Sequence, residues 1–281
     1  MKKFLLFIYI LLFNLTAVFS QNTSEIKSSA SKNVSIIEKE FLIPQLNTIN
    51  HKIWVYLPLN YTKTSKKYPV IYMHDGQNLF DNATSYIGEW EVDETLNELF
   101  KKTGKGFIVV GIENGNEERI NEYTPWENEK YGGGKGEIYI DFLVNTLKPY
   151  IDATYRTKKQ AKHTALIGSS LGGLISYYGG LKYPTVFGKI GALSTSFWFS
   201  NKVEVFTKAY GNTSKIKLYL YVGGKEGEEM VAGTENTKKL LLKTGFKQKN
   251  LKSKINPEGN HNETAWKSEF LEVVKWLYHI K

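Results

Sequence analysis

A short apolar strand, a glycine-flanked serine and an apolar helix follow one another without interruption between residues 164 and 181. Residues 164–167 predict the strand and residues 171–181 the helix, while residues 168–172 (GSSLG) fit the pattern G-x-S-x-G. A serine on a sharp, strained turn between a strand and a helix needs small residues where the two backbones approach closely. A serine that only capped the helix would leave these glycines unexplained. We therefore predict that Ser170 is a nucleophile.

The rest of the chain alternates strand-like with helix-like stretches. Apolar or alternating runs predict strands at residues 34–41, 52–57, 68–73, 107–112, 190–193, 216–222 and 251–255. Helical spacing predicts helices at residues 92–100, 138–151, 234–242 and 264–280. Such alternation is typical of a mostly parallel sheet with helices on both faces. Without an internal repeat or linker, we expect a single α/β domain over residues 34–281.

The N-terminal twenty residues predict a secretory signal peptide. A short basic start is followed by an apolar run over residues 4–19 and then by Ser20. The run is shorter than a membrane span and Asn14 interrupts it, so we expect cleavage near Ser20, export to the periplasm or the medium, and no stable membrane insertion. Residues 21–33 have little to bury and predict a flexible lead-in.

Composition removes several classes of function. The chain has no cysteine, which excludes disulfides and thiol nucleophiles and suits an oxidising compartment. Its formal net charge is +9, but of 37 basic residues only Arg119 and Arg156 are arginine, whereas nucleic-acid readers cluster arginine. No H-E-x-x-H pattern or dinucleotide fingerprint occurs. We therefore expect no nucleic-acid partner, no metal site and no cofactor.

A serine nucleophile needs a base, which is usually histidine. In an α/β-hydrolase the order along the chain is Ser, acid, His, so of the five histidines only His261 and His279 lie late enough. His279 stands near the end of the last predicted helix. His261 lies in a polar turn between the last strand and that helix, and it is the predicted base.

The acid should follow the strand at residues 216–222, and the loop there offers three carboxylates. Glu226 is nearest the strand end and lies between Gly224 and Gly227, which would let the loop fold inward. Glu228 and Glu229 remain alternatives. They could instead be solvated acidic residues whose charge favours the start of a helix.

An acyl oxygen that develops negative charge needs two backbone N–H donors. One is expected from Leu171, which follows the nucleophile. The other is expected from Gln77, in the glycine-containing loop after the strand at residues 68–73. The alternative for this loop is an ordinary turn in which Asp75 bonds its own backbone.

Together these residues resemble the putative esterase family, which includes esterase D, enterochelin esterase-like enzymes and some feruloyl or acetylxylan esterases. The motifs are residues 68–81 (YPVIYMHDGQNLFD), 168–172, 192–198 (ALSTSFW), 223–227 (GGKEG) and 259–263 (GNHNE). The resemblance implies an α/β-hydrolase fold with Ser170, Glu226 and His261 as catalytic residues and Gln77 and Leu171 as the oxyanion hole. Because relatives often carry Asp as the acid, the choice among the three glutamates stays open.

Substrate contacts are expected from a long polar insertion at residues 113–136 and from Trp198. Arg119, in this insertion, could hold an anionic or phenolic group, or could instead pair with Glu117 or Glu118. Trp198 could form an aromatic wall or only pack at the rim.

The function that follows is an exported serine esterase for an acylated saccharide, a siderophore or a small ester. An acyltransferase and an inactive binding homologue are the alternatives. The sequence does not determine the substrate or the oligomeric state.

Overall fold

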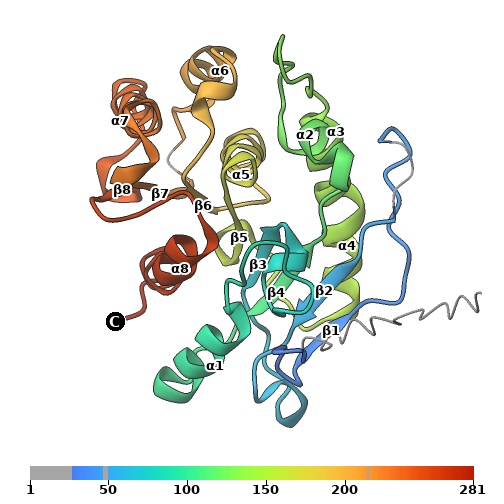
Figure 1. Cartoon of the computed structure of the whole chain (residues 1–281). Coiled ribbons are helices and arrows are strands. Elements are labelled where there is room, and N and C mark those ends of the chain that lie inside the picture. The colour runs from blue at the N-terminus through green and yellow to red at the C-terminus, as the bar shows by residue number, and fades with distance from the viewer. Residues whose placement is uncertain (1–26, 47–49, 214) are drawn as a thin grey trace, which may run out of the picture.

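The computed structural model describes residues 27–46, 50–213 and 215–281 (Figure 1). The predicted signal peptide, residues 1–20, lies outside the described residues. Within these, eight strands form one sheet in the order β1-β2-β4-β3-β5-β6-β7-β8. The strands are β1 (Val34–Ile36), β2 (Ile53–Tyr56), β3 (Val70–His74), β4 (Ile108–Ile112), β5 (Thr164–Ser169), β6 (Lys189–Leu193), β7 (Lys217–Gly223) and β8 (Leu251–Asn256).

The sheet is parallel from β4 to β8, and β1 and β2 are antiparallel to their neighbours. Alternate residues of each central strand enter different cores, because successive side chains point to opposite faces. In β3, Val70 and Tyr72 join one apolar cluster, whereas Ile71 and Met73 join the other. The sequence of a central strand is therefore apolar throughout, as both of its faces are buried.

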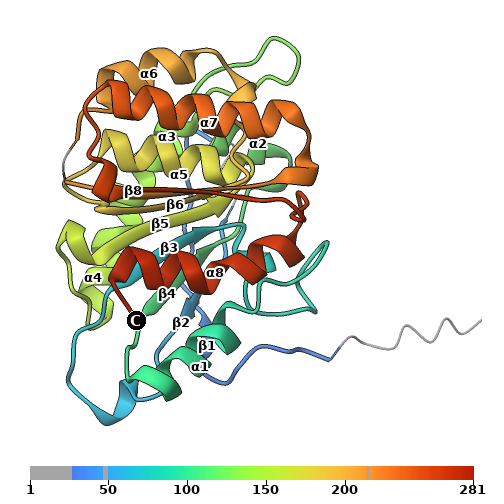
Figure 2. The same cartoon turned by 90° about the vertical axis from the view of Figure 1, so that its left-hand side faces the viewer.

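Helices cover both faces. Helices α1 and α8 lie on one side of the sheet, and α3 to α7 on the other (Figures 1 and 2). The helices are α1 (Val92–Thr103), α2 (Arg119–Tyr123), α3 (Gly136–Phe142), α4 (Lys148–Thr154), α5 (Leu171–Lys182), α6 (Lys202–Tyr210), α7 (Glu228–Lys243) and α8 (Glu263–Tyr278). This layered arrangement confirms the predicted α/β fold.

One predicted helix, residues 138–151, is interrupted. Between α3 and α4 the chain forms a π-helical turn at Leu143–Leu147, and Pro149 occupies the first turn of α4. Proline has no N–H to offer the carbonyl four residues earlier, and a π turn is a common way to absorb such a break.

Three other elements differ from their predictions. The first strand ends at Ile36 rather than at residue 41. Helix α6 has no predicted counterpart, because its β-branched residues also suit a strand. In the structure Val203, Phe206 and Thr207 are buried at helical spacing. Helix α7 begins at Glu228, six residues before the predicted start, so Glu228 and Glu229 lie in its first turn.

The described part of the predicted lead-in, residues 27–33, makes hydrogen bonds with the domain. The Ser29 hydroxyl donates to Glu89 (2.8 Å), and the Ser31 N–H donates to Asp93 (2.8 Å). Among the described residues no helix combines the length and apolar character needed to cross a bilayer.

Three strands are each followed, at the carboxyl edge of the sheet, by a non-glycine residue with positive φ. Asp75 follows β3 (φ 55°), Ser170 follows β5 (φ 56°) and Ser194 follows β6 (φ 44°). Non-glycine residues with positive φ are uncommon and cluster at functional sites. The carboxyl ends of parallel strands are also where α/β proteins bind ligands. This edge therefore holds the candidate site.

Candidate active site

Ser170 lies on a strained turn between β5 and α5, with φ 56° and ψ −123°. A Cβ added to Gly168 would lie 2.5 Å from the carbonyl oxygen of Gly172, so the strand and the helix can meet only if residue 168 is glycine. The neighbouring strand fixes the turn, because the Ser170 N–H donates to the Leu193 carbonyl (2.9 Å) and the Ser170 carbonyl accepts from the Ser196 N–H (3.2 Å). This is the geometry of a nucleophile elbow.

His261 and Glu226 form a hydrogen-bonded pair. Nδ1 of His261 lies 2.8 Å from Oε2 of Glu226. The Glu226 side chain is fully buried, whereas the His261 side chain is 38% exposed. A buried carboxylate beside Nδ1 would fix the tautomer and orientation of the ring and leave Nε2 for proton transfer.

The second oxygen of Glu226 is also bound. Its Oε1 accepts from the Gly223 N–H (2.6 Å) and from the Ser194 hydroxyl (2.5 Å). The Ser194 oxygen in turn accepts from Nε1 of Trp266 (2.8 Å), and the Trp266 ring lies edge-on to His261 with centroids 5.1 Å apart. This role of Ser194 was not predicted from the sequence. The only signal for it was its place in the motif at residues 192–198.

Of the three candidate acids, the structure brings Glu226 to His261. Glu228 and Glu229 lie in the first turn of α7, where carboxylates favour the positive end of the helix dipole. Glu229 lines a different hollow, together with Phe197 and Trp198.

Ser170 and His261 line the same cavity of about 400 Å³. Its other walls come from the ends of β3 and β4, the loop before α1 and the start of α8. The remaining lining residues are His74, Asp75, Gln77, Asn78, Tyr86, Ile87, Trp90, Asn114, Asn116, Arg119, Ser169, Glu263 and Trp266. The cavity therefore joins the predicted nucleophile and base, with Glu226 bound to the far side of His261.

Of the other predicted site residues, Gln77 and Leu171 lie at or next to the cavity, whereas Trp198 lies elsewhere. Gln77, in a short turn after β3, lines the cavity, and Leu171 directly follows Ser170 as the first residue of α5. Trp198 is not brought to this cavity. It is 42% exposed, lines two other hollows and contacts the ring of Tyr131 (centroids 5.8 Å apart). The geometry gives no support for a role of Trp198 at the site.

Comparison with known proteins agrees with this geometry. Residues 47–277 match the model of a protein family described as "Putative esterase". The chain belongs to this esterase family. The predicted resemblance is thereby confirmed, and the membership supports the hydrolysis of carboxylic esters as the activity.

The esterase is similar to several known proteins. It is 30% identical to the uncharacterized protein YbbA of Bacillus subtilis, over 82% of this chain and 93% of YbbA. It is 29% identical to an endo-1,4-beta-xylanase/feruloyl esterase of Xylanibacter ruminicola, over 80% of this chain and 29% of that protein. The siderophore hydrolase EstA of Aspergillus nidulans has the same fold, with a TM-score of 0.72 and 17% identity over 89% of this chain and 96% of EstA. The α/β-hydrolase fold is thus confirmed.

Arg119 of the esterase forms an ion pair with Asp75. Its Nε and Nη2 donate to the two carboxylate oxygens (2.7 and 3.0 Å), and the amide of Asn114 donates to the same carboxylate (2.6 Å). Burial alone would raise the pKa of Asp75, but the Arg119 charge and these hydrogen bonds lower it. Of the two alternatives for Arg119, the structure does not show the pairing with Glu117 or Glu118: its ion pair is with Asp75. Arg119 also lines the cavity, where the other alternative would place it.

His74 lies beneath the elbow at the end of β3. Its Nδ1 is 3.0 Å from the Tyr139 hydroxyl, and the residue is 2% exposed. Burial lowers the pKa of His74 to about 4; Asp75 opposes this shift and Arg119 adds to it. His74 is therefore neutral at physiological pH, so it adds no positive charge to the cavity.

Glu263, the first residue of α8, is a second buried carboxyl group in this cavity. It is 4% exposed, and its Oε2 has no hydrogen-bond partner among the described residues. Burial raises the pKa of Glu263, and Asp75 adds to the rise, while its own backbone N–H, His261 and Arg119 oppose it. The folded esterase thus holds a carboxyl group that resists ionisation beside the predicted base.

Replacing Glu263 by glutamine should stabilise the esterase at alkaline pH. A carboxyl group whose pKa is raised by folding contributes stability below its unfolded pKa, and this contribution is lost as pH rises through the folded pKa. We expect the melting temperature of Glu263→Gln to exceed that of the wild type at pH 8, and the difference to vanish or reverse at pH 4. Thermal unfolding at the two pH values measures this. Glu258→Gln, which changes a surface carboxylate paired with Lys225, is the control, and an equal response of both variants would contradict the prediction.

Proposed function

We propose that this esterase is an exported serine hydrolase that cleaves carboxylic esters through an acyl-enzyme. The observation that carries the proposal is the shared cavity of Ser170 and His261, with Glu226 bound to Nδ1 of His261 at 2.8 Å. The strained backbone of Ser170, which is typical of a nucleophile elbow, supports the role of its hydroxyl as nucleophile.

In the first half of the reaction, Oγ of Ser170 attacks the ester carbonyl and His261 takes its proton at Nε2. The N–H groups of Gln77 and Leu171 stabilise the negative charge on the carbonyl oxygen. The C–O bond to the alcohol then breaks, and His261 returns the proton to the departing oxygen. Ser170 is left acylated.

In the second half, His261 takes a proton from water, whose oxygen attacks the acyl carbon. The bond between this carbon and Ser170 breaks, and the proton passes to the serine oxygen. Glu226 keeps its charge throughout and stabilises the imidazolium form of His261. The buried chain from Trp266 through Ser194 would hold Glu226 in place.

The walls of the cavity favour an ester that carries a ring or several hydroxyl groups. Tyr86 and Ile87 expose apolar surface at the cavity, while Gln77 and Asn116, which are not buried, can bond to hydroxyl groups. A relative named as a feruloyl esterase and a similar structure named as a siderophore hydrolase are consistent with such a substrate. We propose an acylated saccharide, a siderophore or a small aromatic ester.

Hydrolysis of short-chain p-nitrophenyl esters tests the reaction, and a panel of feruloyl, acetyl-sugar and catecholate esters tests the substrate class. Turnover of the p-nitrophenyl esters supports the proposal. No turnover of any ester, with binding of one of them, would show a binding protein instead. A product that forms only when a sugar acceptor is present would show an acyltransferase.

Export rests on the leader at residues 1–20, which lies outside the described residues. Cell fractionation, with the mass of the mature chain, tests it. A cytoplasmic protein of full length would contradict export and leave the esterase assignment untouched.

A further inference from the structure

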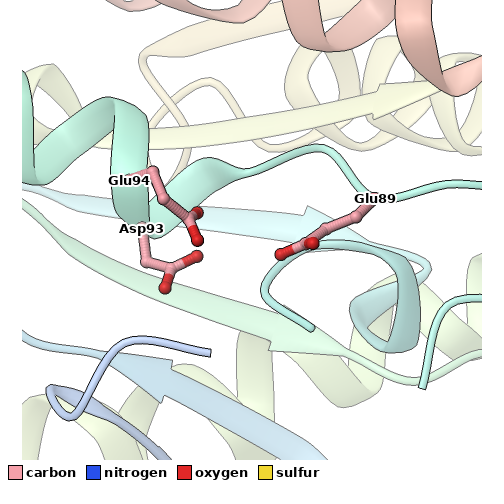
Figure 3. A group of neighbouring side chains, drawn as sticks. All are labelled: Glu89, Asp93 and Glu94. Atoms are coloured by element: carbon pink, nitrogen blue, oxygen red, sulfur yellow. The ribbon is translucent and has the colours of Figure 1, made fainter. Parts of the chain in front are cut away.

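Three acidic side chains gather at the start of α1, away from the catalytic residues. Glu89 extends from the loop before the helix toward Asp93 and Glu94, which lie in its first turn (Figure 3). Each of the three carboxyl groups places one oxygen within 4.8 Å of an oxygen from both others. The helix dipole favours acids in the first turn, which accounts for Asp93 and Glu94 but not for Glu89, outside the helix.

Each of these carboxyl groups also has one buried oxygen without a hydrogen-bond donor from the described residues. These atoms are Oε1 of Glu89, Oδ1 of Asp93 and Oε2 of Glu94. Asp93 is completely buried (0% exposed), and no lysine, arginine or histidine within the described ranges forms an ion pair with any of the three. A buried carboxylate oxygen without a donor or a positive charge is costly, so the cluster lacks the counter-charge that three carboxylates require.

The pKa values of two of these carboxyl groups are consistent with the lack of counter-charge. Burial raises the pKa of Glu94 to about 8; a hydrogen bond that a protonated Glu94 shares with Asp93 and the charges of Asp93 and Glu89 add to the rise, while its own backbone N–H opposes it. Burial likewise raises the pKa of Glu89, against a hydrogen bond from Ser29. Burial is the largest cause of the shift in both residues.

We propose that Glu89, Asp93 and Glu94 bind a divalent cation, and that Ca²⁺ fits the site best. All three ligands are hard carboxylate oxygens, which Ca²⁺ and Mg²⁺ prefer. The three oxygens lie within 4.8 Å of one another, close enough to share one ion. Ca²⁺ accepts about six to eight oxygens in flexible geometry, whereas Mg²⁺ requires a near-ideal octahedron, so side chains from both a loop and a helix suit Ca²⁺ better.

The N-terminal segment orients these ligands. The Ser29 hydroxyl donates to Oε2 of Glu89 (2.8 Å), and the Ser31 N–H donates to Oδ2 of Asp93 (2.8 Å). In both residues one carboxylate oxygen accepts this bond, and the other oxygen of the same carboxylate is the one without a donor. The cation would therefore join the segment at residues 28–31, the loop before α1 and the helix itself.

The same loop forms one wall of the active-site cavity. Tyr86, Ile87 and Trp90 line the cavity, and Glu89 lies between Ile87 and Trp90 in the chain. Tyr86 and Ile87 are 88% and 75% exposed, so few contacts of their own hold them. We expect the bound cation to brace this wall. Its effect on catalysis, which rests on the proposed function, should be a lower KM with little change in kcat.

The experiment compares the full-length mature protein after EDTA treatment with the same protein in CaCl₂. Titration calorimetry should find one Ca²⁺ per chain. At a concentration about 100 times the Kd, the melting temperature should rise by roughly 5–10 °C. MgCl₂ at the same concentration should have a smaller effect. Binding and melting do not depend on activity, so they decide the cation site even if the esterase proposal fails.

Asp93→Asn keeps the shape of the side chain and removes its charge. This variant should lose Ca²⁺ binding and the rise in melting temperature. In EDTA it should be at least as stable as the wild type, because it relieves the repulsion. Glu98→Gln, on the same helix but in a surface pair with Lys101, should respond like the wild type. Should Asp93→Asn fail to fold, Glu89→Gln replaces it.

Three results would overturn the proposal. The first is stripped wild-type protein that neither binds Ca²⁺ nor becomes more stable in it. The second is an Asp93→Asn or Glu89→Gln variant that keeps the full response. The third, an equal response to Mg²⁺, would overturn the choice of Ca²⁺.

Discussion

Replacing Ser170 by alanine should lower kcat for a p-nitrophenyl ester by at least about 10⁴-fold, because the remaining groups cannot form the acyl-enzyme. The fold should tolerate the change, since alanine at this position loses only the 3.3 Å contact between the hydroxyl oxygens of Ser170 and Ser196. Initial rates at saturating substrate, together with the melting temperature of each protein, measure the two effects. KM should change far less than kcat.

Ser176→Ala is the matched control for this experiment. Ser176 lies on the same helix, and its buried hydroxyl donates to the Gly172 carbonyl (2.8 Å) without lining the cavity. This variant should keep kcat within a few-fold of the wild type and lose about 1 kcal/mol of stability. A Ser170→Ala protein that retains more than a tenth of wild-type activity would refute the assigned nucleophile.

Glu226→Gln should be the next most damaging change, with a loss in kcat of about 10³–10⁴-fold. Both carboxylate oxygens of Glu226 face donors: Oε1 faces the Gly223 N–H and the Ser194 hydroxyl, and Oε2 faces Nδ1 of His261. An amide must turn its NH₂ group toward one side or the other. Either His261 loses its acceptor and its tautomer, or the Gly223 N–H meets another donor, at a cost of about 1–3 kcal/mol.

The acidic residue two positions later provides the comparison. Glu228→Gln alters a carboxylate in the first turn of α7 and should leave kcat unchanged. Steady-state kinetics and urea unfolding of the two variants measure the contrast. If Glu228→Gln or Glu229→Gln were the inactive variant and Glu226→Gln the active one, the assignment of the acid would be wrong.

The sequence predicted most of the fold because each central element carries its own local signal. The strand–serine–helix segment around Ser170 combines hydrophobic period with glycine spacing, and the structure places its parts as predicted. The position of His261 followed from its place between the last strand and α8. Helix boundaries were less certain, since the polar first turn of α7 has no apolar stripe.

Contacts between segments that are far apart in the sequence could not be predicted from local patterns. Asp75 and Arg119 are 44 residues apart, and Ser194 and Trp266 are 72 apart. Each pair depends on how two loops leave the sheet, which no local pattern encodes. Glu89, Asp93 and Glu94 are close in sequence, but their lack of positive partners becomes visible only when the surrounding charges are placed. For Trp198, at the end of the motif at residues 192–198, an aromatic wall and packing at the rim were both open, and the turn after β6 directs it to another surface.

The link from Trp266 through Ser194 to Glu226 makes the geometry of the site depend on the docking of α8. Trp266 belongs to α8, the last helix of the chain, and its indole N–H holds the serine that in turn holds the acid. His261 stands just ahead of the same helix. A chain in which α8 has not docked would thus form the strained turn at Ser170 without bringing His261 and Glu226 into position beside it.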